Sequence, residues 1–215
     1  MLSDGFAYWL SIDCSAACSN HTINFAPFGR RTWADAHAGY HGALGATSMR
    51  CIFLCVDGLD PQIQEFRARY DPLGLLVEPH VTLVFPFEMD SPDEVLIEHV
   101  SSKIASTSRF SASIHHQPTM ESDYVYLPID KGSAQVKALH NLLYVGVLEQ
   151  FRQDRPYVPH ITIGRVRNEN SRDILEALKS LEIESKIMIN RLKIERIGPN
   201  GESEIISEHL LGLRT

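Results

Sequence analysis

The sequence has no long hydrophobic run. None of its apolar stretches reaches the roughly 18 consecutive apolar residues that a membrane helix needs. The apolar segment from Phe6 to Ile12 follows no basic residue and is flanked by Asp4 and Asp13, which is unlike a signal peptide. We therefore expect a protein that has no membrane partner and works in the cytoplasm.

Positive charge is also in deficit. The chain has 20 lysines and arginines against 27 aspartates and glutamates, which gives a formal net charge of −7. Non-specific affinity for long nucleic acid comes from neutralising many phosphates, so this acidic chain is a poor candidate for binding a long duplex. A local basic site could still bind a small anionic ligand.

Cysteine is scarce, with four residues in the chain. Cys14 and Cys18 form one Cys-x3-Cys pair, and Cys51 and Cys55 form another, whereas structural zinc sites usually include Cys-x2-Cys with closely placed partners. Cys51 and Cys55 lie in an apolar run typical of a strand, where buried thiols are common. We expect reduced core cysteines and no metal site.

The first 48 residues differ from the rest. They are rich in Ala, Gly, Ser and His, contain no lysine, and show no sustained helical or strand period. From Met49 the sequence becomes a strand-like apolar run. We expect residues 1–48 to be an irregular appendage and residues 49–215 to be one domain built by internal duplication, with units at about 49–118 and 119–215.

Each expected unit repeats the order strand, helix, strand, helix, strand. Asp60-Pro61 supplies an N-cap and a proline at the first helical position, and Ser91 and Ser133 are the expected caps of two further helices. The patterns predict strands over 50–57, 79–87, 109–116, 123–129, 158–166, 186–197 and about 203–210, and helices over 61–69, 91–106, 133–151 and 171–181.

Two near-identical stretches occupy the middle strand of each unit. Of the ten histidines, only His80 and His160 have a threonine two positions on. Side chains at i and i+2 of a strand share a face, so each histidine projects beside its threonine, Thr82 or Thr162. The stretches are Pro79-His80-Val81-Thr82-Leu83 and Pro159-His160-Ile161-Thr162-Ile163.

Paired imidazoles and hydroxyls suit phosphodiester chemistry if the two units pack with approximate two-fold symmetry. One neutral histidine would take a proton from the attacking oxygen, and the other, protonated, would give one to the leaving oxygen. The threonine hydroxyls would hold phosphate oxygens, and no metal or other cofactor is required. The competing interpretation is two hydrogen-bonded core histidines beside strand-forming threonines.

The paired motif resembles that of the two-histidine (2H) phosphoesterase superfamily, in its 2′-5′ RNA ligase-like, cyclic phosphodiesterase branch. The resemblance covers about residues 49–215 and implies a bilobal α+β fold, with two pseudo-symmetric β-α-β-α-β units and mainly antiparallel sheets around a central cleft. It implies hydrolysis of 2′,3′-cyclic phosphates or related diesters, with 2′-5′ RNA ligation as a weaker reverse reaction in some members. His80 and His160 would be the catalytic pair.

The resemblance also implies phosphate-binding roles for Thr82, Thr162 and Arg165, a basic residue that follows the second motif. Phe85 holds the equivalent place in the first motif, so the copies are not chemically equal. Phe85 and Tyr157 are candidates for stacking a base, as is Phe87, although we expect at least two of these three rings to pack in the core.

The expected substrate is a nucleotide or an RNA terminus, bound by a monomer, and the acidic surface disfavours a long duplex. Two alternatives stay open. One is a nucleotide- or RNA-end-binding module without significant turnover. The other is a metal hydrolase that draws on the ten histidines, which the missing Asp/Glu spacing signatures disfavour.

Overall fold

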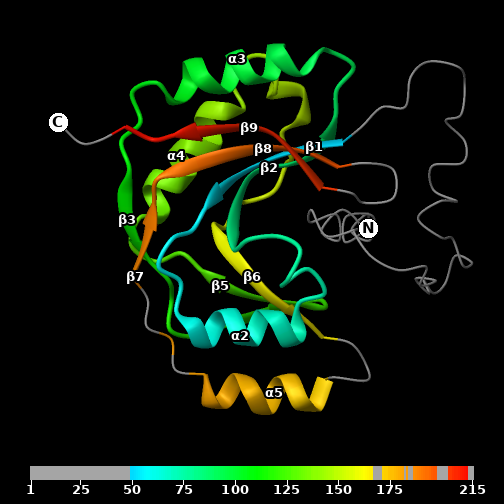
Figure 1. Cartoon of the computed structure of the whole chain (residues 1–215), viewed down its shortest axis with the longest axis vertical. Coiled ribbons are helices and arrows are strands. Elements are labelled where there is room, and N and C mark those ends of the chain that lie inside the picture. Colours follow the sequence, from blue (N-terminus) through cyan, green and yellow to red (C-terminus); the bar gives the residue numbers. More distant parts are fainter. Residues whose placement is uncertain (1–48, 167–170, 182, 184–185, 198–202, 213–215) are drawn as a thin grey trace, which may run out of the picture.

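A computed structural model describes residues 49–166, 171–181, 183, 186–197 and 203–212 (Figure 1). The expected appendage (1–48) therefore lies outside the described residues. The elements, in chain order, are β1 (Met49–Cys55), α2 (Pro61–Tyr70), β2 (His80–Glu88), α3 (Asp93–Ile104), β3 (Phe110–Ser113), β4 (Thr119–Glu121), β5 (Tyr124–Pro128), α4 (Ser133–Leu143), the short 3₁₀ helix η2 (Glu149–Phe151), β6 (His160–Arg165), α5 (Ser171–Ser180), β7 (Lys186–Ile189), β8 (Arg191–Ile197) and β9 (Ser203–Leu210).

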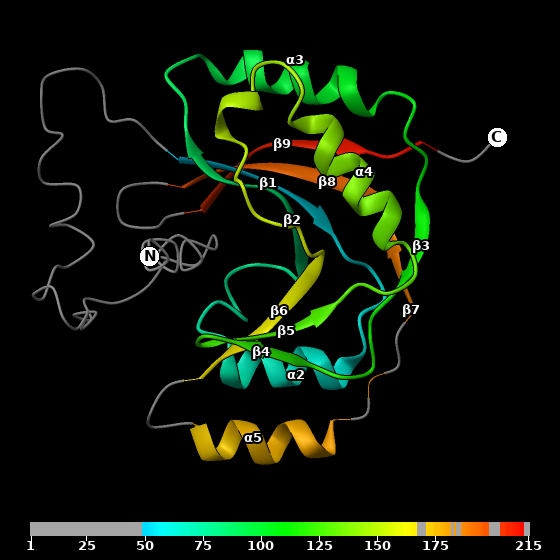
Figure 2. The same ribbon diagram turned by 180° about the vertical axis from the view of Figure 1, so that it is seen from behind.

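The strands form antiparallel sheets, as expected for this α+β fold. One sheet has the order β2-β1-β8-β9, another β4-β5-β6, and β3 pairs with β7. Helices α3 and α4 lie at one end of the molecule and α2 and α5 at the other (Figures 1 and 2). Because β8 and β9 join β1 and β2, the two halves of the sequence share a sheet. The division into two pseudo-symmetric units near residue 118 stays a prediction.

Strand β1 is buried on both faces, which explains its unbroken apolar sequence. Ile52 and Leu54 belong to the main hydrophobic core, whereas Phe53 and Cys55 belong to a smaller cluster on the opposite face. Fully burying each such large side chain contributes about 1.5–3 kcal/mol. Both cysteines of the strand are buried free thiols, as predicted. The smaller cluster lies on the face that also carries the first His-x-Thr pair.

The predicted cap of α2 is confirmed, and the other two predicted caps are wrong. Asp60 accepts a hydrogen bond from the amide of Gln62 at 2.8 Å. Helix α3 begins only at Asp93, because Pro92 has an extended conformation (ψ 150°) and acts as the cap in place of Ser91. Helix α4 begins at Ser133 itself, after a left-handed Gly132, so Ser133 makes no side-chain cap.

Two predicted elements are too long. Helix α4 ends at Leu143 and not near residue 151, because Gly146 has a φ of 91° that a helix interior does not allow. The predicted strand over 186–197 is two strands in different sheets, separated at Asn190. The Asn190 amide donates to the Asp57 carboxylate at 2.6 Å, which fixes the break. The short strand β4 was not predicted.

We expect Gly74→Ala to lower the free energy of unfolding by about 1–3 kcal/mol, the usual cost of overpacking. A Cβ atom on Gly74 would lie 2.3 Å from the carbonyl oxygen of Arg67, a backbone atom of α2 that has little freedom to move. Urea denaturation measures the change. Gly212→Ala is the matched control, since its Cβ would meet the nearest atom at an ordinary 3.6 Å. Equal effects of the two substitutions would contradict the prediction.

Candidate active site

The two His-x-Thr copies lie at the starts of two adjacent strands. His80 is the first residue of β2 and His160 is the first residue of β6. Each strand is at the edge of its sheet, and β2 and β6 contact each other. Both ribbon views show the starting ends of these strands next to one another near the middle of the molecule (Figures 1 and 2). The fold therefore brings the two motifs together from positions 80 and 160 of the sequence.

Both histidine rings are held by the same backbone contact. His80 Nδ1 lies 3.0 Å from the carbonyl oxygen of Glu78, and His160 Nδ1 lies 2.7 Å from that of Val158. A carbonyl oxygen can only accept, so Nδ1 donates in both rings and carries the proton. The neutral form of each ring then has its lone pair on Nε2, which can accept a proton.

Each histidine also packs against an aromatic ring of the neighbouring strand. The centroids of His80 and Phe53 are 4.8 Å apart, and those of His160 and Tyr126 are 4.5 Å apart. Phe53 is the register partner of Thr82, and Tyr126 is that of Thr162. Thr82 is buried, and Thr162 is partly buried. In both copies, an aromatic residue of the neighbouring strand thus packs on the histidine and lies opposite the threonine. This shared packing was not predicted from the sequence.

A cluster of three side chains binds the backbone of β2. His140 comes from α4, Tyr144 directly follows α4, and Tyr157 lies in the segment before β6. His140 Nδ1 donates to the carbonyl oxygen of Leu83 at 2.7 Å, and the Tyr157 hydroxyl donates to that of Thr82 at 2.6 Å. The amide of Phe85 donates to the Tyr144 hydroxyl at 3.3 Å. These bonds satisfy backbone groups of an edge strand, which side chains must do where no further strand pairs.

Burial sets the ionisation of this cluster. It lowers the pKa of His140, so that the ring is neutral at pH 7, and it raises the pKa of Tyr144 to about 12. It raises the pKa of Tyr157 as well. The ring of His140 stacks on that of Tyr157 with centroids 3.7 Å apart and planes 2° apart. His140 is therefore a buried contact to the motif strand.

The remaining predicted residues differ in their contacts. Arg165 donates from Nη2 to the hydroxyl of Tyr124, and its guanidinium lies 4.3 Å from the centroid of that ring. Phe85 lies under the guanidinium of Arg155 at 4.5 Å and meets Tyr157 edge-on at 6.3 Å.

Phe87 is buried against Phe151, so it packs in the core.

In the described part of the chain, no three His, Cys, Asp or Glu side chains lie close enough together to hold a metal ion. No helix in the same part is long and apolar enough to cross a membrane. The neighbouring histidines His115 and His116 contact each other through tilted rings, with centroids 4.5 Å apart.

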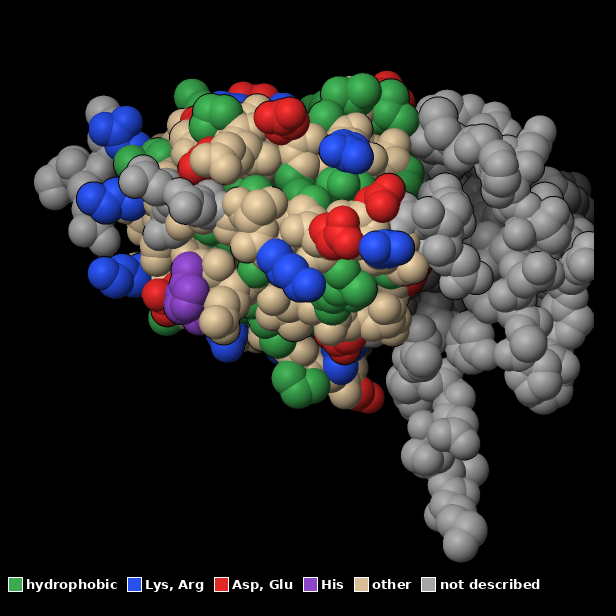
Figure 3. All heavy atoms as spheres, turned by 90° about the horizontal axis from the view of Figure 1, so that it is seen from below, with side chains coloured by type: hydrophobic (Ala, Val, Ile, Leu, Met, Phe, Trp, Pro, Cys, Tyr) green, Lys and Arg blue, Asp and Glu red, His purple; other side chains and the backbone are tan. Residues whose placement is uncertain are grey.

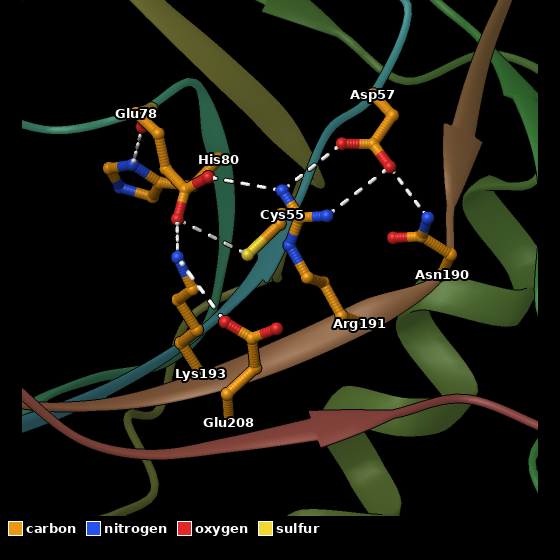
Figure 4. A network of polar contacts seen from close by, with 8 residues as sticks. All are labelled: Cys55, Asp57, Glu78, His80, Asn190, Arg191, Lys193 and Glu208. Carbon is orange, nitrogen blue, oxygen red and sulfur yellow. Dashed lines mark hydrogen bonds and ion pairs between the residues drawn. The ribbon is translucent and has the colours of Figure 1, made fainter.

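A polar network lies beside His80 (Figure 4). The Glu78 carboxylate accepts hydrogen bonds from Lys193, from Arg191 at 3.4 Å and from the thiol of Cys55 at 3.5 Å. Burial alone would raise the pKa of Glu78, but the bonds from Lys193, Cys55 and Arg191 outweigh it and the pKa is lowered. Burial raises the pKa of the Cys55 thiol to about 12, so the sulfur stays protonated and donates.

The lowered pKa of Glu78 predicts a loss of stability in acid. A carboxyl whose folded pKa is depressed contributes stability above its unfolded pKa of about 4.3, and this is lost as the pH falls through the folded pKa. Urea unfolding of the wild type and Glu78→Gln between pH 3 and about 7 measures the difference. The gap between the two proteins should be largest at pH 7 and should narrow as the pH falls from about 4.3 through the lowered folded pKa. A gap that does not change with pH would contradict the prediction.

The sequence is similar to a known family and to known proteins. A profile of the 2′-5′ RNA ligase superfamily matches residues 56–199. A protein of Bacillus licheniformis is 28% identical over 160 residues, covering 68% of this chain and 88% of the relative. One of Oceanobacillus iheyensis is 35% identical over 127 residues, covering 56% and 72%. Both bear the name "Putative phosphoesterase".

Solved structures show the same fold. A crystal structure titled as a phosphoesterase has a TM-score of 0.52 at 17% identity, covering 77% of this chain and 99% of that one. Escherichia coli LigT in complex with 3′-AMP has a TM-score of 0.51 at 18% identity, covering 76% and 98%. The matched profile covers most of the chain, and the Oceanobacillus relative is covered over more than two thirds of its length. The chain belongs to the 2′-5′ RNA ligase superfamily, the 2H phosphoesterases.

Proposed function

We propose that the protein is a metal-independent phosphodiesterase that hydrolyses a 2′,3′-cyclic phosphate or a related diester of a nucleotide or RNA end. The observation that carries the proposal is the matched pair of histidines. Both begin adjacent edge strands, and both donate from Nδ1 to the carbonyl two residues earlier. Both imidazoles therefore have the same tautomer, with Nε2 as the working atom.

Hydrolysis then needs one proton transfer at each ring. The Nε2 atom of one neutral histidine takes a proton from water as the water oxygen forms a bond to phosphorus. The bond from phosphorus to one ribose oxygen breaks, and that oxygen takes the proton from Nε2 of the other, protonated histidine. In the proposed weak 2′-5′ ligation, a 5′-hydroxyl of a second RNA end takes the place of water: it loses its proton to Nε2 of the neutral histidine and bonds to phosphorus, while the bond to the 3′-oxygen breaks and that oxygen takes a proton from the other histidine. This step is the reverse of cleavage of a 2′-5′ linkage, in which the two histidines exchange roles.

Thr82, Thr162 and Arg165 are the proposed phosphate ligands. The hydroxyls share a strand face with His80 and His160, so they lie where the non-bridging oxygens gain charge. Arg165 lies at the end of the second motif strand, beside Tyr124. A guanidinium there would add a charge-assisted contact, which the first motif lacks because Phe85 stands in the equivalent place.

A nucleoside base would stack on Phe85 in preference to Tyr157. Tyr157 has His140 against one ring face and its hydroxyl bound to β2, so we assign it to holding the strand. Phe85 has Arg155 over its ring, and a guanidinium beside an aromatic ring is a common platform for bases.

The proposed substrate is short. Among the described residues on the face seen from below, acidic and basic side chains are interspersed with apolar ones and form no continuous basic track (Figure 3). A long duplex would need such a track for its phosphates. A mononucleotide or an RNA end needs only the local site. Names of the relatives support a phosphoesterase, and LigT was crystallised with the nucleotide 3′-AMP.

The experiment is incubation of the purified protein with 2′,3′-cyclic AMP, with and without EDTA, followed by chromatographic separation of the products. We expect AMP to form at the same rate in both. Saturable binding of the cyclic nucleotide without product would favour the binding-module alternative. Turnover that EDTA abolishes would overturn the metal-independent mechanism.

A further inference from the structure

Glu78 contacts the site in two ways. Its backbone carbonyl oxygen accepts a hydrogen bond from Nδ1 of His80 at 3.0 Å, and its side chain belongs to the polar network of Figure 4. There the carboxylate is bound by Lys193, by Arg191 and by the Cys55 thiol. The residue that fixes the histidine tautomer is therefore itself fixed by three side chains of the sheet.

The anchors of Glu78 are tied to rigid elements. Lys193 and Arg191 project from β8, which pairs with β1 on one side and β9 on the other. Arg191 also pairs with Asp57 at 3.2 Å, and Lys193 also lies 3.6 Å from Glu208 of β9. The Lys193 side chain is only 16% exposed, so these charges are partly shielded from solvent and their attraction is stronger than at an open surface.

The second motif has no such anchor at the matching position. The carbonyl that accepts from His160 belongs to Val158, whose side chain is apolar and 47% exposed. An isopropyl group makes no hydrogen bond or ion pair. The two copies therefore differ before the histidine as well as after the threonine. The residue that accepts from His80 has a side chain bonded to the sheet, and the residue that accepts from His160 has a side chain that cannot make such bonds.

We propose that Glu78 is a positioning residue for the first motif, which keeps the His80 ring in the Nδ1-protonated tautomer by anchoring the carbonyl that accepts from it. The proposal rests on the proposed function for its catalytic consequence, though not for its structural one. Glu78 does not touch the reacting atoms. It acts through His80, whose Nε2 must keep a fixed direction for proton transfer, and misplacement of a group by about 1 Å can cost about 100-fold in rate.

The test compares Glu78→Ala and Glu78→Gln with Glu208→Gln. Glu208→Gln also removes a carboxylate from beside Lys193 but leaves residue 78 unchanged. It therefore reproduces the loss of one negative charge without the loss of the Glu78 anchor. Heteronuclear NMR of the imidazole nitrogens reports the tautomer of His80 directly, and steady-state kinetics with 2′,3′-cyclic AMP separates kcat from KM. Circular dichroism confirms that each variant is folded.

We expect Glu78→Ala to give His80 a mixture of tautomers and to lower kcat by about 10–100-fold with KM changed less than about threefold. Glu78→Gln, whose amide oxygen can still accept from Lys193, should restore part of the Nδ1-protonated tautomer and part of kcat. Glu208→Gln should leave the tautomer as in the wild type. If Glu78→Ala does not fold, the NMR comparison of Glu78→Gln with Glu208→Gln decides.

An unchanged His80 tautomer in the Glu78 variants would overturn the proposal, even where His80→Ala is inactive. Absence of turnover in the wild type would instead overturn the proposed function. The NMR result would still decide whether Glu78 holds the ring, so the two failures are distinguishable.

Discussion

Replacing His80 or His160 with alanine is expected to lower kcat on 2′,3′-cyclic AMP by about 10²–10⁴-fold, the usual contribution of one positioned acid or base. In the proposed mechanism each imidazole serves a different proton transfer in the same turnover, so neither could replace the other. The rate of AMP formation, measured by chromatography at saturating substrate, gives the effect. The double variant should lose little more than either single one, because residues that act as a unit are not additive.

His115→Ala is the matched control for these variants. His115 is a partly exposed histidine, and the ring contacts described for it are to its neighbours His116 and Gln117. Its removal should leave kcat within about twofold of the wild type, since surface substitutions away from a site have small effects. Either motif variant that keeps more than about a tenth of the wild-type rate while folded would contradict the two-histidine mechanism.

Arg67→Ala is expected to lower the free energy of unfolding by about 3–5 kcal/mol, the cost of breaking a buried ion pair by removing one partner. Arg67 donates to Asp71 at 3.1 Å and to the carbonyl oxygen of Val77 at 3.3 Å. The side chains of this pair are 4% and 6% exposed, so Asp71 would be left as a buried charge. Urea denaturation measures the loss.

Arg172→Ala is a control of the same chemistry in a different environment. Arg172 and Glu176 also form an i,i+4 pair, at 3.3 Å, but their side chains are 88% and 64% exposed. Such a pair contributes only about 0.3–0.5 kcal/mol. If both arginine variants lose the same free energy, burial is not what makes the Arg67 pair matter. The Arg67 pair is relevant to the site because Asp71 and Val77 lie on the segment that leads into His80.

The parts of the site that sequence predicted are those set by local geometry. The period of a strand places His80 beside Thr82 whatever else the chain does, and the repeat of the motif predicted a second such pair at His160. The cap at Asp60 was predicted for the same reason, since its partner is the amide two residues on. The fold class was an expectation from the superfamily resemblance that the paired motif carries.

The parts that sequence did not predict depend on partners far along the chain. Lys193 is 115 residues from Glu78, and Tyr157 is 75 residues from the Thr82 carbonyl that it binds. No local period predicts such pairs. The overlong helix is a different case: Gly146 was visible in the sequence as a stop signal, but the apolar stripe that continues past it favoured a longer helix.

If the two His-x-Thr copies act on one phosphate, a crystal structure of the protein with inorganic phosphate tests this most directly. We expect one phosphate within hydrogen-bond distance of Nε2 of both His80 and His160, with the hydroxyls of Thr82 and Thr162 on its oxygens. A phosphate held by one motif alone, or two imidazoles too far apart to share one phosphate, would contradict it.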